Sequence, residues 1–174
     1  QSPSKFYCVY QDARYQGLPV FITTDSLLNS YRGLYNALTQ RLEEGPLLER
    51  MQEMTHALYD QATGQWGAAA DADVKEAAWQ NRVFFAVATA LLDPQAPLPQ
   101  ELGEQVQAEL DLISTAEGPA ESPNLGYTQD YRRYSPPGHY ARNDRLQRYF
   151  KAVTWYSESA FYFDTSYPDV TESE

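Results

Sequence analysis

The sequence lacks the features that mark common catalytic and membrane classes. It contains one cysteine, Cys8, in 174 residues, which excludes an intramolecular disulfide and a zinc site built on several thiolates. No run of roughly 18 apolar residues occurs, so no stretch of the sequence predicts a transmembrane helix. Serine-nucleophile motifs and glycine-rich phosphate loops are missing as well. We therefore expect no metal site and no cofactor, and we assign no catalytic residue.

Positive charge is also scarce. The chain has 13 Lys and Arg residues against 24 Asp and Glu residues, a net charge of −11. A strongly acidic protein repels phosphate backbones, so nucleic-acid binding is not expected. The apolar fraction of 43% nevertheless suffices for a hydrophobic core, and the length is typical of one domain. We expect a single helical domain over residues 1–174.

Hydrophobic periodicity predicts a mainly α fold with about five helices in an irregular bundle. Apolar residues recur at helical spacing in five stretches, at about 24–44, 46–63, 71–92, 99–113 and 143–156. Gly45-Pro46 is expected to end the first helix and open the second, which would make the two antiparallel neighbours. Gly64 to Gly67 is expected to end the second. The third is apolar nearly all round, as a central, buried helix is.

Other parts of the chain are expected to be non-helical. The aromatic run at 6–10 and the segment 19–23 indicate an extended N-terminal segment, with coil packed against helices as the alternative. Residues 114–142 form a long loop rich in Pro, Gly and Tyr, and its tyrosines favour packing over disorder. The chain starts without Met, and its acidic end at 161–174 has no capped final element. Either a leader has been removed or the chain is a piece of a longer one, and the uncapped end favours the second alternative.

A basic segment before and within the last helix is the best candidate for a binding site. Residues 130–151 contain six basic and two acidic residues, although the chain as a whole is acidic. Free N–H groups and the dipole at a helix N-terminus favour an anion, so a carboxylate, a phosphate or an acidic sugar would fit here. The candidate ligand-binding residues are His139, Tyr140, Arg142, Arg145 and Arg148. The alternative is that these arginines pair with acidic residues in the first half of the chain.

Three further features have a functional and a structural interpretation. Asp25 is a candidate ligand-binding residue and a possible general acid or base with Glu43 or Glu44, but it stands among four capping residues, and a helix cap is the simpler role. Glu53-x-x-His56 has the spacing of one di-iron ligand pair without the second pair, so His56 is expected to be a partly exposed helix residue. Cys8 is expected to be a buried, inert thiol.

Aromatic residues in the second half also allow two interpretations. They could stack against sugar rings, because an aromatic face offers apolar area with a polar rim, or they could pin the long loop onto the last helix. We favour the structural role. The residues are Tyr127, Tyr131, Tyr134, Tyr140, Trp155 and Tyr156.

Several stretches resemble a known family. They are residues 19–28, 90–94 and 109–113, and the segment that starts at Gly138-His139-Tyr140 and ends at Trp155-Tyr156. Together they are similar to a bacterial and archaeal family, domain of unknown function three-one-six-zero, over about residues 15–160. The resemblance implies a long, largely helical, exported protein, often a lipoprotein, of which this chain would be the N-terminal part. The chain departs from the family's pattern at Asn29 and Pro137, so no role is carried over to those positions.

Taken together, these features predict a non-catalytic, extracytoplasmic interaction or assembly subunit of a larger envelope-associated protein or complex. Its partners would be other protein subunits or the remainder of its own chain. Any membrane contact would be made through a partner or an anchor outside this segment. The alternative is a glycan-binding or glycan-processing domain that uses residues 130–156, with a glycan or another anionic compound as its ligand.

Overall fold

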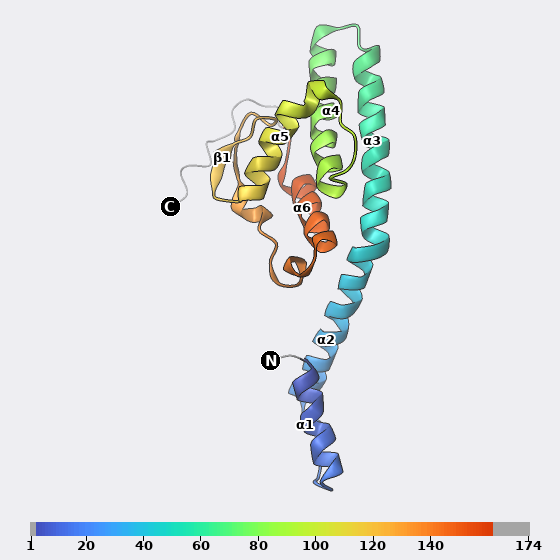
Figure 1. Ribbon diagram of the computed structural model, residues 1–174, viewed down its shortest axis with the longest axis vertical. Coiled ribbons are helices and arrows are strands. Elements are labelled where there is room, and N and C mark those ends of the chain that lie inside the picture. Colours follow the sequence, from blue (N-terminus) through green and yellow to red (C-terminus); the bar gives the residue numbers. More distant parts are fainter. Residues whose placement is uncertain (1–2, 162–174) are drawn as a thin grey trace. The chain divides into compact units, whose positions relative to one another are not determined.

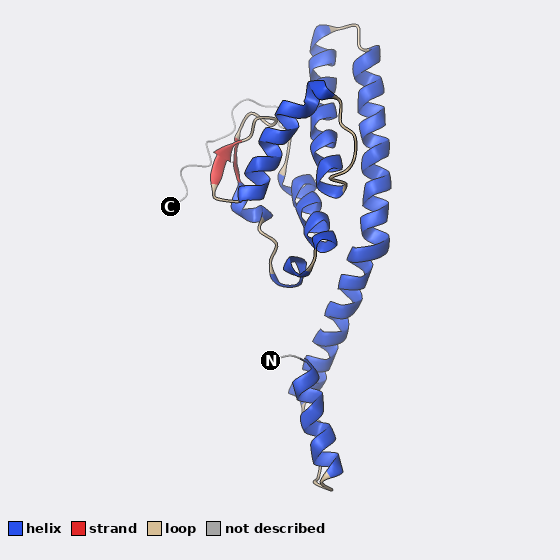
Figure 2. Cartoon of the chain, viewed as in Figure 1, coloured by secondary structure: helices blue, strands red, loops and turns tan. Residues whose placement is uncertain are grey.

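A computed structural model describes residues 3–161 and divides the chain into two compact units. Unit 1 is Gln1–Leu42 and unit 2 is Glu43–Glu174. The described residues form six α-helices, two short strands and a few tighter or wider helical turns (Figures 1 and 2). The mainly α class is therefore confirmed. The acidic end, for which no capped element is expected, lies outside the described residues from 162 onward, and the single domain stays a prediction.

Unit 1 consists of helices α1, Pro3–Tyr15, and α2, Thr24–Leu42. Residues 18–23 between them have no helical structure, as the extended segment at 19–23 predicts. Residues 6–10 lie within α1 instead. Tyr7, Tyr10 and Arg14 are three and four residues apart, so the same aromatic run also fits one face of a helix.

The chain remains helical through Gly45-Pro46. Residues Glu43–Leu47 form a π-helical turn, η1, and α3 follows directly as Leu48–Ala68. Pro46 has no amide hydrogen and fits a turn that leaves the α-helical bonding pattern. The prediction that one helix ends and another begins at Gly45-Pro46 is therefore wrong. The break predicted at Gly64 to Gly67 is also wrong, because an isolated glycine costs only about 1 kcal/mol in a helix and does not end it.

Helix α4, Ala72–Leu92, is the central helix of unit 2. The Asp71 side chain caps it by accepting from the backbone N–H groups of Asp73 and Val74, at 2.9 and 3.2 Å. Helices α3, α5 (Gln100–Thr115) and α6 (Asp144–Glu158) pack against α4 (Figure 1). Ten of its residues are buried, which confirms the predicted central position.

Short elements order the long loop before α6. Strands β1, Pro119–Glu121, and β2, Thr128–Asp130, pair antiparallel, and the 3₁₀ turns η2, Tyr131–Tyr134, and η3, Gly138–Arg142, follow (Figure 2). Gly138 has φ +54°, a left-handed conformation that glycine adopts without strain. The Asn143 side chain then caps α6, accepting from the Leu146 N–H at 3.0 Å.

Candidate functional site

The candidates His139 and Tyr140 converge on a buried carboxylate. Glu43 of η1 has a side chain only 8% exposed. Tyr140 Oη donates to Glu43 Oε1 at 2.7 Å, and His139 Nε2 lies 3.0 Å from Glu43 Oε2. The two rings lie 4.0 Å apart between centroids, and the Tyr140 ring also packs on Phe150 at 5.0 Å. One carboxylate therefore joins η1 to η3, and we call Glu43, His139 and Tyr140 the Glu43 latch.

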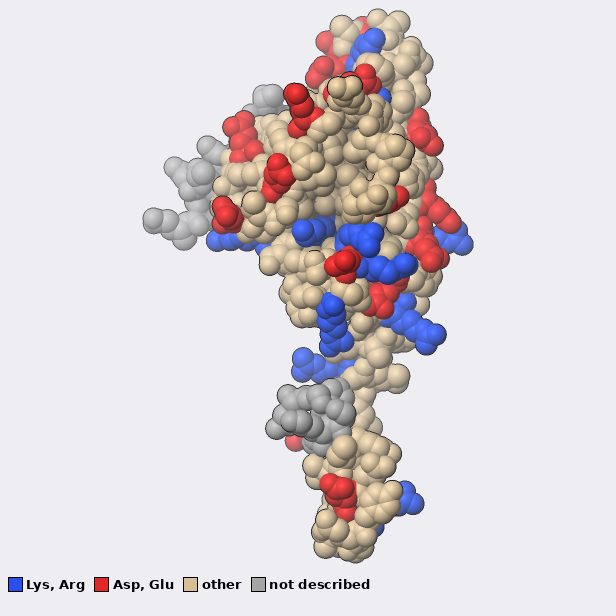
Figure 3. Space-filling view, viewed as in Figure 1, with Lys and Arg blue, Asp and Glu red and all other residues tan. Residues whose placement is uncertain are grey.

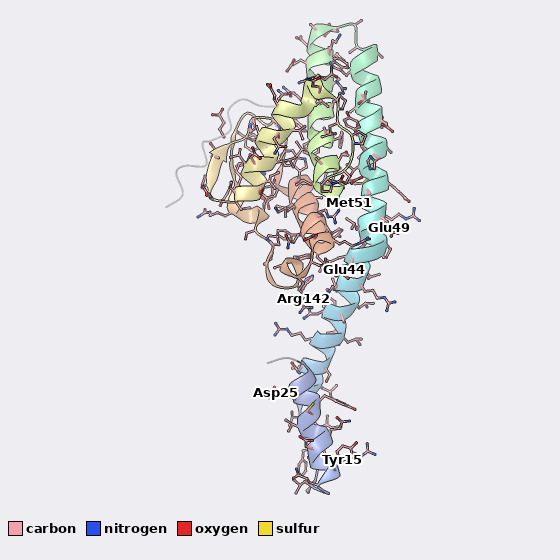
Figure 4. The ribbon with its side chains drawn as sticks, viewed as in Figure 1. Tyr15, Asp25, Glu44, Glu49, Met51 and Arg142 are labelled. Atoms are coloured by element: carbon pink, nitrogen blue, oxygen red, sulfur yellow. The ribbon has the colours of Figure 1, made fainter. Side chains whose placement is uncertain are left out.

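Glu44 extends this junction toward α6. Its carboxylate accepts a hydrogen bond from Asn143 Nδ2, and its carbonyl accepts one from Arg145 Nε at 2.8 Å. The Arg145 guanidinium also lies 4.0 Å from Glu49 Oε1. Figure 4 labels Glu44 on η1, Glu49 on α3 and Arg142 on η3. Arg145 therefore pairs with acidic and backbone groups from the first half of the chain, as the structural interpretation predicts.

Several other basic residues of the segment are held by local partners. The contacts are Arg148 Nε to the Asp144 carbonyl at 3.2 Å, Arg132 with Asp130 at 2.7 Å and Arg133 with Glu158 at 2.7 Å. The hydrogen bond from Arg132 lowers the pKa of Asp130. Figure 3 shows basic side chains gathered on the part of unit 2 that holds η3 and α6.

A hollow of about 490 Å³ lies beside α6 in this basic region. Arg148 and Lys151 line it, together with Gln95, Gln147 and the Asp144 carboxylate. Burial lowers the pKa of Lys151, which shows that its ammonium is partly removed from water. Two cations and two amides could hold a small polar or anionic ligand, although Asp144 opposes an anion.

Asp25 lies in unit 1, in the first turn of α2, where it is exposed (Figure 4). The cap that we expected it to make belongs to Thr23, whose Oγ1 accepts from the Ser26 N–H at 3.2 Å. Ser26 Oγ in turn donates to the Thr23 carbonyl at 2.7 Å. A carboxylate in the first turn still interacts favourably with the helix dipole, and this is the role that the local structure gives Asp25.

The remaining polar candidates have structural roles. Glu53 pairs with Arg50 at 2.7 Å, and His56 is exposed on α3, so the helix-surface prediction for His56 is confirmed. Within residues 3–161, no three His, Cys, Asp or Glu side chains come together as a metal site requires. Cys8 is exposed on α1, so the expected buried thiol is wrong. The reason is that α1 leaves most of its side chains in solvent.

A second buried carboxylate was not predicted. Glu109 of α5 is 0% exposed and accepts from Ser122 Oγ at 2.7 Å, from Asn124 Nδ2 at 3.0 Å and from Tyr131 Oη. Burial and the adjacent carboxylate raise the pKa of Tyr131. The network ties the loop to α5. A glutamate in the apolar stripe formed by Val106 and Ile113 was the signal that could have revealed it.

Three of the six aromatic candidates for sugar stacking are buried, and the other three are half-buried. Tyr131, Tyr134 and Trp155 are 1%, 0% and 0% exposed. Trp155 stacks on Phe84 at 5.2 Å, and its Nε1 donates to the Phe84 carbonyl at 3.1 Å. These three rings cannot face a ligand in solvent. They fix η2 and α6 in the core, which is the structural role that we favoured.

Unit 1 instead carries an exposed apolar surface. Of the 18 large apolar residues that are exposed in the described chain, 14 lie in unit 1, and these 14 form what we call the unit 1 surface. They are Tyr7, Val9, Tyr15, Leu18, Val20, Phe21, Ile22, Leu27, Leu28, Tyr31, Leu34, Tyr35, Leu38 and Leu42. Over residues 7–42, Ser26 alone is buried. A groove of about 650 Å³ between α1 and α2 is part of this surface.

The structure thus defines a mainly helical protein with a well-packed unit and a helical unit whose apolar side chains are open. The chain matches the family model described as Protein of unknown function (DUF3160) over residues 1–174 and belongs to this family. The resemblance seen in the sequence is confirmed and extends over the whole chain. No curated protein and no solved structure matches it. None of the helices in residues 3–161 is long and apolar enough to span a bilayer.

Proposed function

We propose that the chain is a non-catalytic, extracytoplasmic interaction or assembly subunit, and that the unit 1 surface packs against a helical partner protein. The observation that carries this proposal is the exposure of Phe21, Ile22 and Leu34, at 79%, 77% and 70%. Exposed apolar patches of this kind typically mark interaction sites. Removing Leu- or Phe-sized side chains from water stabilises a complex by about 1.5–3 kcal/mol each. A partner that covers six of them would gain roughly 10 kcal/mol before the cost of association.

The local structure of unit 1 supports the same conclusion. Helices α1 and α2 have 13 and 19 residues. Isolated helices of this length are marginally stable in water, and most helix stability in proteins comes from packing of an apolar face. Over residues 7–42, no apolar side chain of unit 1 is buried. A partner that covers this face would supply the missing stabilisation.

The polar groups of unit 2 favour a non-catalytic role. His139 and Tyr140 both bind Glu43, and three side-chain donors bind Glu109. These donors come from the protein itself, and both carboxylates are buried. A general base must lie within hydrogen-bond reach of its substrate, and burial keeps these two carboxylates away from solvent. Both sites are better explained as polar junctions that hold the loop and η1 in place.

In vivo photo-crosslinking tests the assembly role. A photoreactive amino acid replaces Leu34 on the unit 1 surface in the full-length gene product, and the matched control replaces Val74, 58% exposed on α4 of unit 2. We expect an intermolecular adduct of defined mass from position 34 and none from position 74. No adduct at 34, or an adduct only within the same chain, would refute a partner protein at this surface.

The extracytoplasmic location rests on the family resemblance to exported proteins. Fractionation of cells that make the full-length product is expected to place it in the envelope, with a leader removed. Recovery of the intact product from the cytoplasm would contradict this part of the proposal and leave the unit 1 surface to be tested on its own.

The hollow beside α6 favours a second candidate, the binding of a glycan or another anionic ligand by residues 130–156. Arg148 and Lys151 supply its positive charge. Titration with an acidic oligosaccharide tests it, with Lys151→Ala as the variant and Lys75→Ala on α4 as the control. Binding that both variants retain equally would place the ligand elsewhere.

A further inference from the structure

We infer that the partner of unit 1 presents an amphipathic helix whose apolar stripe is flanked by acidic residues. The inference rests on the proposed function and adds the chemistry of the partner to it. It depends on the spacing of the apolar residues of α2, on the groove beside them and on the charges around both.

The apolar residues of α2 are spaced for packing against a helix. Leu28, Tyr31, Tyr35, Leu38 and Leu42 follow one another in alternating steps of three and four residues, the heptad spacing by which two helices interlock. They are between 44% and 65% exposed. At a rise of about 1.5 Å per residue the stripe is roughly 20 Å long, which matches a partner helix of about four turns.

The groove between α1 and α2 widens this surface. Tyr7 and Tyr10 of α1 and Leu27 and Leu34 of α2 are among the residues that line it. Leu27 and Leu34 stand beside the heptad stripe on α2, so the apolar area is broader than a two-helix seam requires. A partner helix seated here would contact both helices of unit 1.

The charges around this surface are mainly positive. Residues 1–42 contain four basic and two acidic residues, although the whole chain has a net charge of −11. Among the residues whose side chains are described, Arg14 is the only charged one that lines the groove, and Arg32 and Arg41 are adjacent in sequence to Tyr31 and Leu42 of the stripe. These three arginines are exposed and form no ion pair within residues 7–161.

Complementary charge at the edge of an interface selects the partner and speeds association. Acidic residues beside the partner's stripe would pair with Arg14, Arg32 and Arg41. Two copies of unit 1 would instead bring basic flanks together without acids to pair them, and flanking charges of this kind set partner choice in helix pairs. A different, acidic helix therefore fits better than a second copy.

Peptide binding to the whole 174-residue chain tests this inference. Cys8 is exposed, is the sole cysteine and does not line the groove, so it can carry a fluorescent label. The probes are synthetic helical peptides of about three heptads with one leucine stripe. One has Glu flanks, one has Lys flanks, and one has Glu flanks with Ser in place of Leu. We expect the Glu peptide to bind at least about tenfold more tightly than the Lys peptide at low salt, with a difference that shrinks as salt screens the charges. The Ser peptide should not bind.

Variants of the chain sharpen the test. Arg14→Glu combined with Arg41→Glu should reverse the preference between the Glu and Lys peptides. Leu34→Asp should weaken both peptides, whereas Arg50→Glu, an exposed site on α3 of unit 2, should change neither.

The outcomes separate the inference from the proposed function. Equal binding of the Glu and Lys peptides would overturn the acidic flanks and leave apolar assembly intact. Failure of both peptides, together with no adduct at position 34, would overturn the proposed function as well. A stable dimer of the labelled chain in sedimentation, which Leu34→Asp dissociates and the Glu peptide does not, would assign the surface to a second copy and refute the inference.

Discussion

Removal of the Tyr140 hydroxyl should destabilise unit 2 measurably. Tyr140→Phe keeps the ring, which packs on His139 and Phe150, and removes the hydroxyl that donates the hydrogen bond of 2.7 Å to Glu43. Glu43 is buried, so water cannot replace the lost donor freely. Hydrogen bonds to charged groups contribute about 1.5–3 kcal/mol. We expect the free energy of unfolding to fall by about 2 kcal/mol.

Two further variants bracket this value. Tyr140→Ala also removes the ring, and loss of a large packed aromatic costs about 3–5 kcal/mol. Arg145→Ala tests the exposed side of the same junction, because it removes the 2.8 Å hydrogen bond to the Glu44 carbonyl and the 4.0 Å contact with Glu49 from a side chain that is 53% exposed. Exposed ion pairs contribute under about 1 kcal/mol. The expected order of destabilisation is Tyr140→Ala, then Tyr140→Phe, then Arg145→Ala.

Urea unfolding followed by tryptophan fluorescence measures these differences. All three tryptophans, Trp66, Trp79 and Trp155, lie in unit 2, so the signal reports the unit that contains the latch. The slope of free energy against urea should stay constant across the variants, since the surface exposed on unfolding does not change. Equal, small losses for Tyr140→Phe and Arg145→Ala would show that Glu43 does not depend on Tyr140. The latch would then have no structural role.

Three other predictions follow from the buried network and from unit 1. Glu109→Ala leaves two buried donors, Ser122 and Tyr131, and the half-buried Asn124 without their acceptor, and it should cost about 3–5 kcal/mol in urea unfolding. Glu104→Ala, exposed on the same helix, should change the stability by no more than about 0.5 kcal/mol, and equal effects of the two variants would contradict the buried network. Burial raises the pKa values of Tyr131 and Tyr134, so the folded protein keeps these protons after the unfolded chain has lost them. The two protonated tyrosines should therefore contribute fully to the free energy of unfolding below about pH 10, and this contribution should fall as the pH rises further. Tyrosinate absorbance from these two side chains before the protein unfolds would refute the assignment. Cys8 should react completely with a maleimide in the native protein, as its exposure requires, and protection until denaturation would contradict it.

Helix identity followed from the sequence because it depends on local features. The apolar periodicity located α4 and α6, and in the structure the side chains of Asp71 and Asn143 cap these two helices. The errors at Gly45-Pro46 and at Gly64 to Gly67 have one physical cause. Glycine and proline lower the stability of a helix, and packing of the apolar face of a long helix can compensate for that loss. The sequence alone does not show whether such packing occurs.

The candidate site was predicted in part. His139, Tyr140 and Arg145 lie together at one junction, as their spacing in sequence allowed. The groups that they bind come from elsewhere: His139 and Tyr140 bind Glu43, 96 residues before His139, and Arg145 binds the Glu44 carbonyl. A contact of that separation depends on tertiary structure. Only the excess of basic residues in 130–151 over an acidic first half indicated that such pairs would form, and it could not name the partner.

The net charge of the whole chain does not describe the charge of unit 1. Surface charges act over a Debye length of about 8–10 Å at ordinary salt, so a partner at unit 1 responds most strongly to the charges beside the apolar residues, those of residues 1–42. The negative net charge of the chain belongs to the remaining residues, since 22 of the 24 acidic residues lie beyond Leu42. The expectation that the protein does not bind nucleic acid, which follows from negative net charge, therefore applies to unit 2. The open apolar surface lies in a region with four basic residues and two acidic ones, and an acidic helix satisfies both its charge and its apolar stripe.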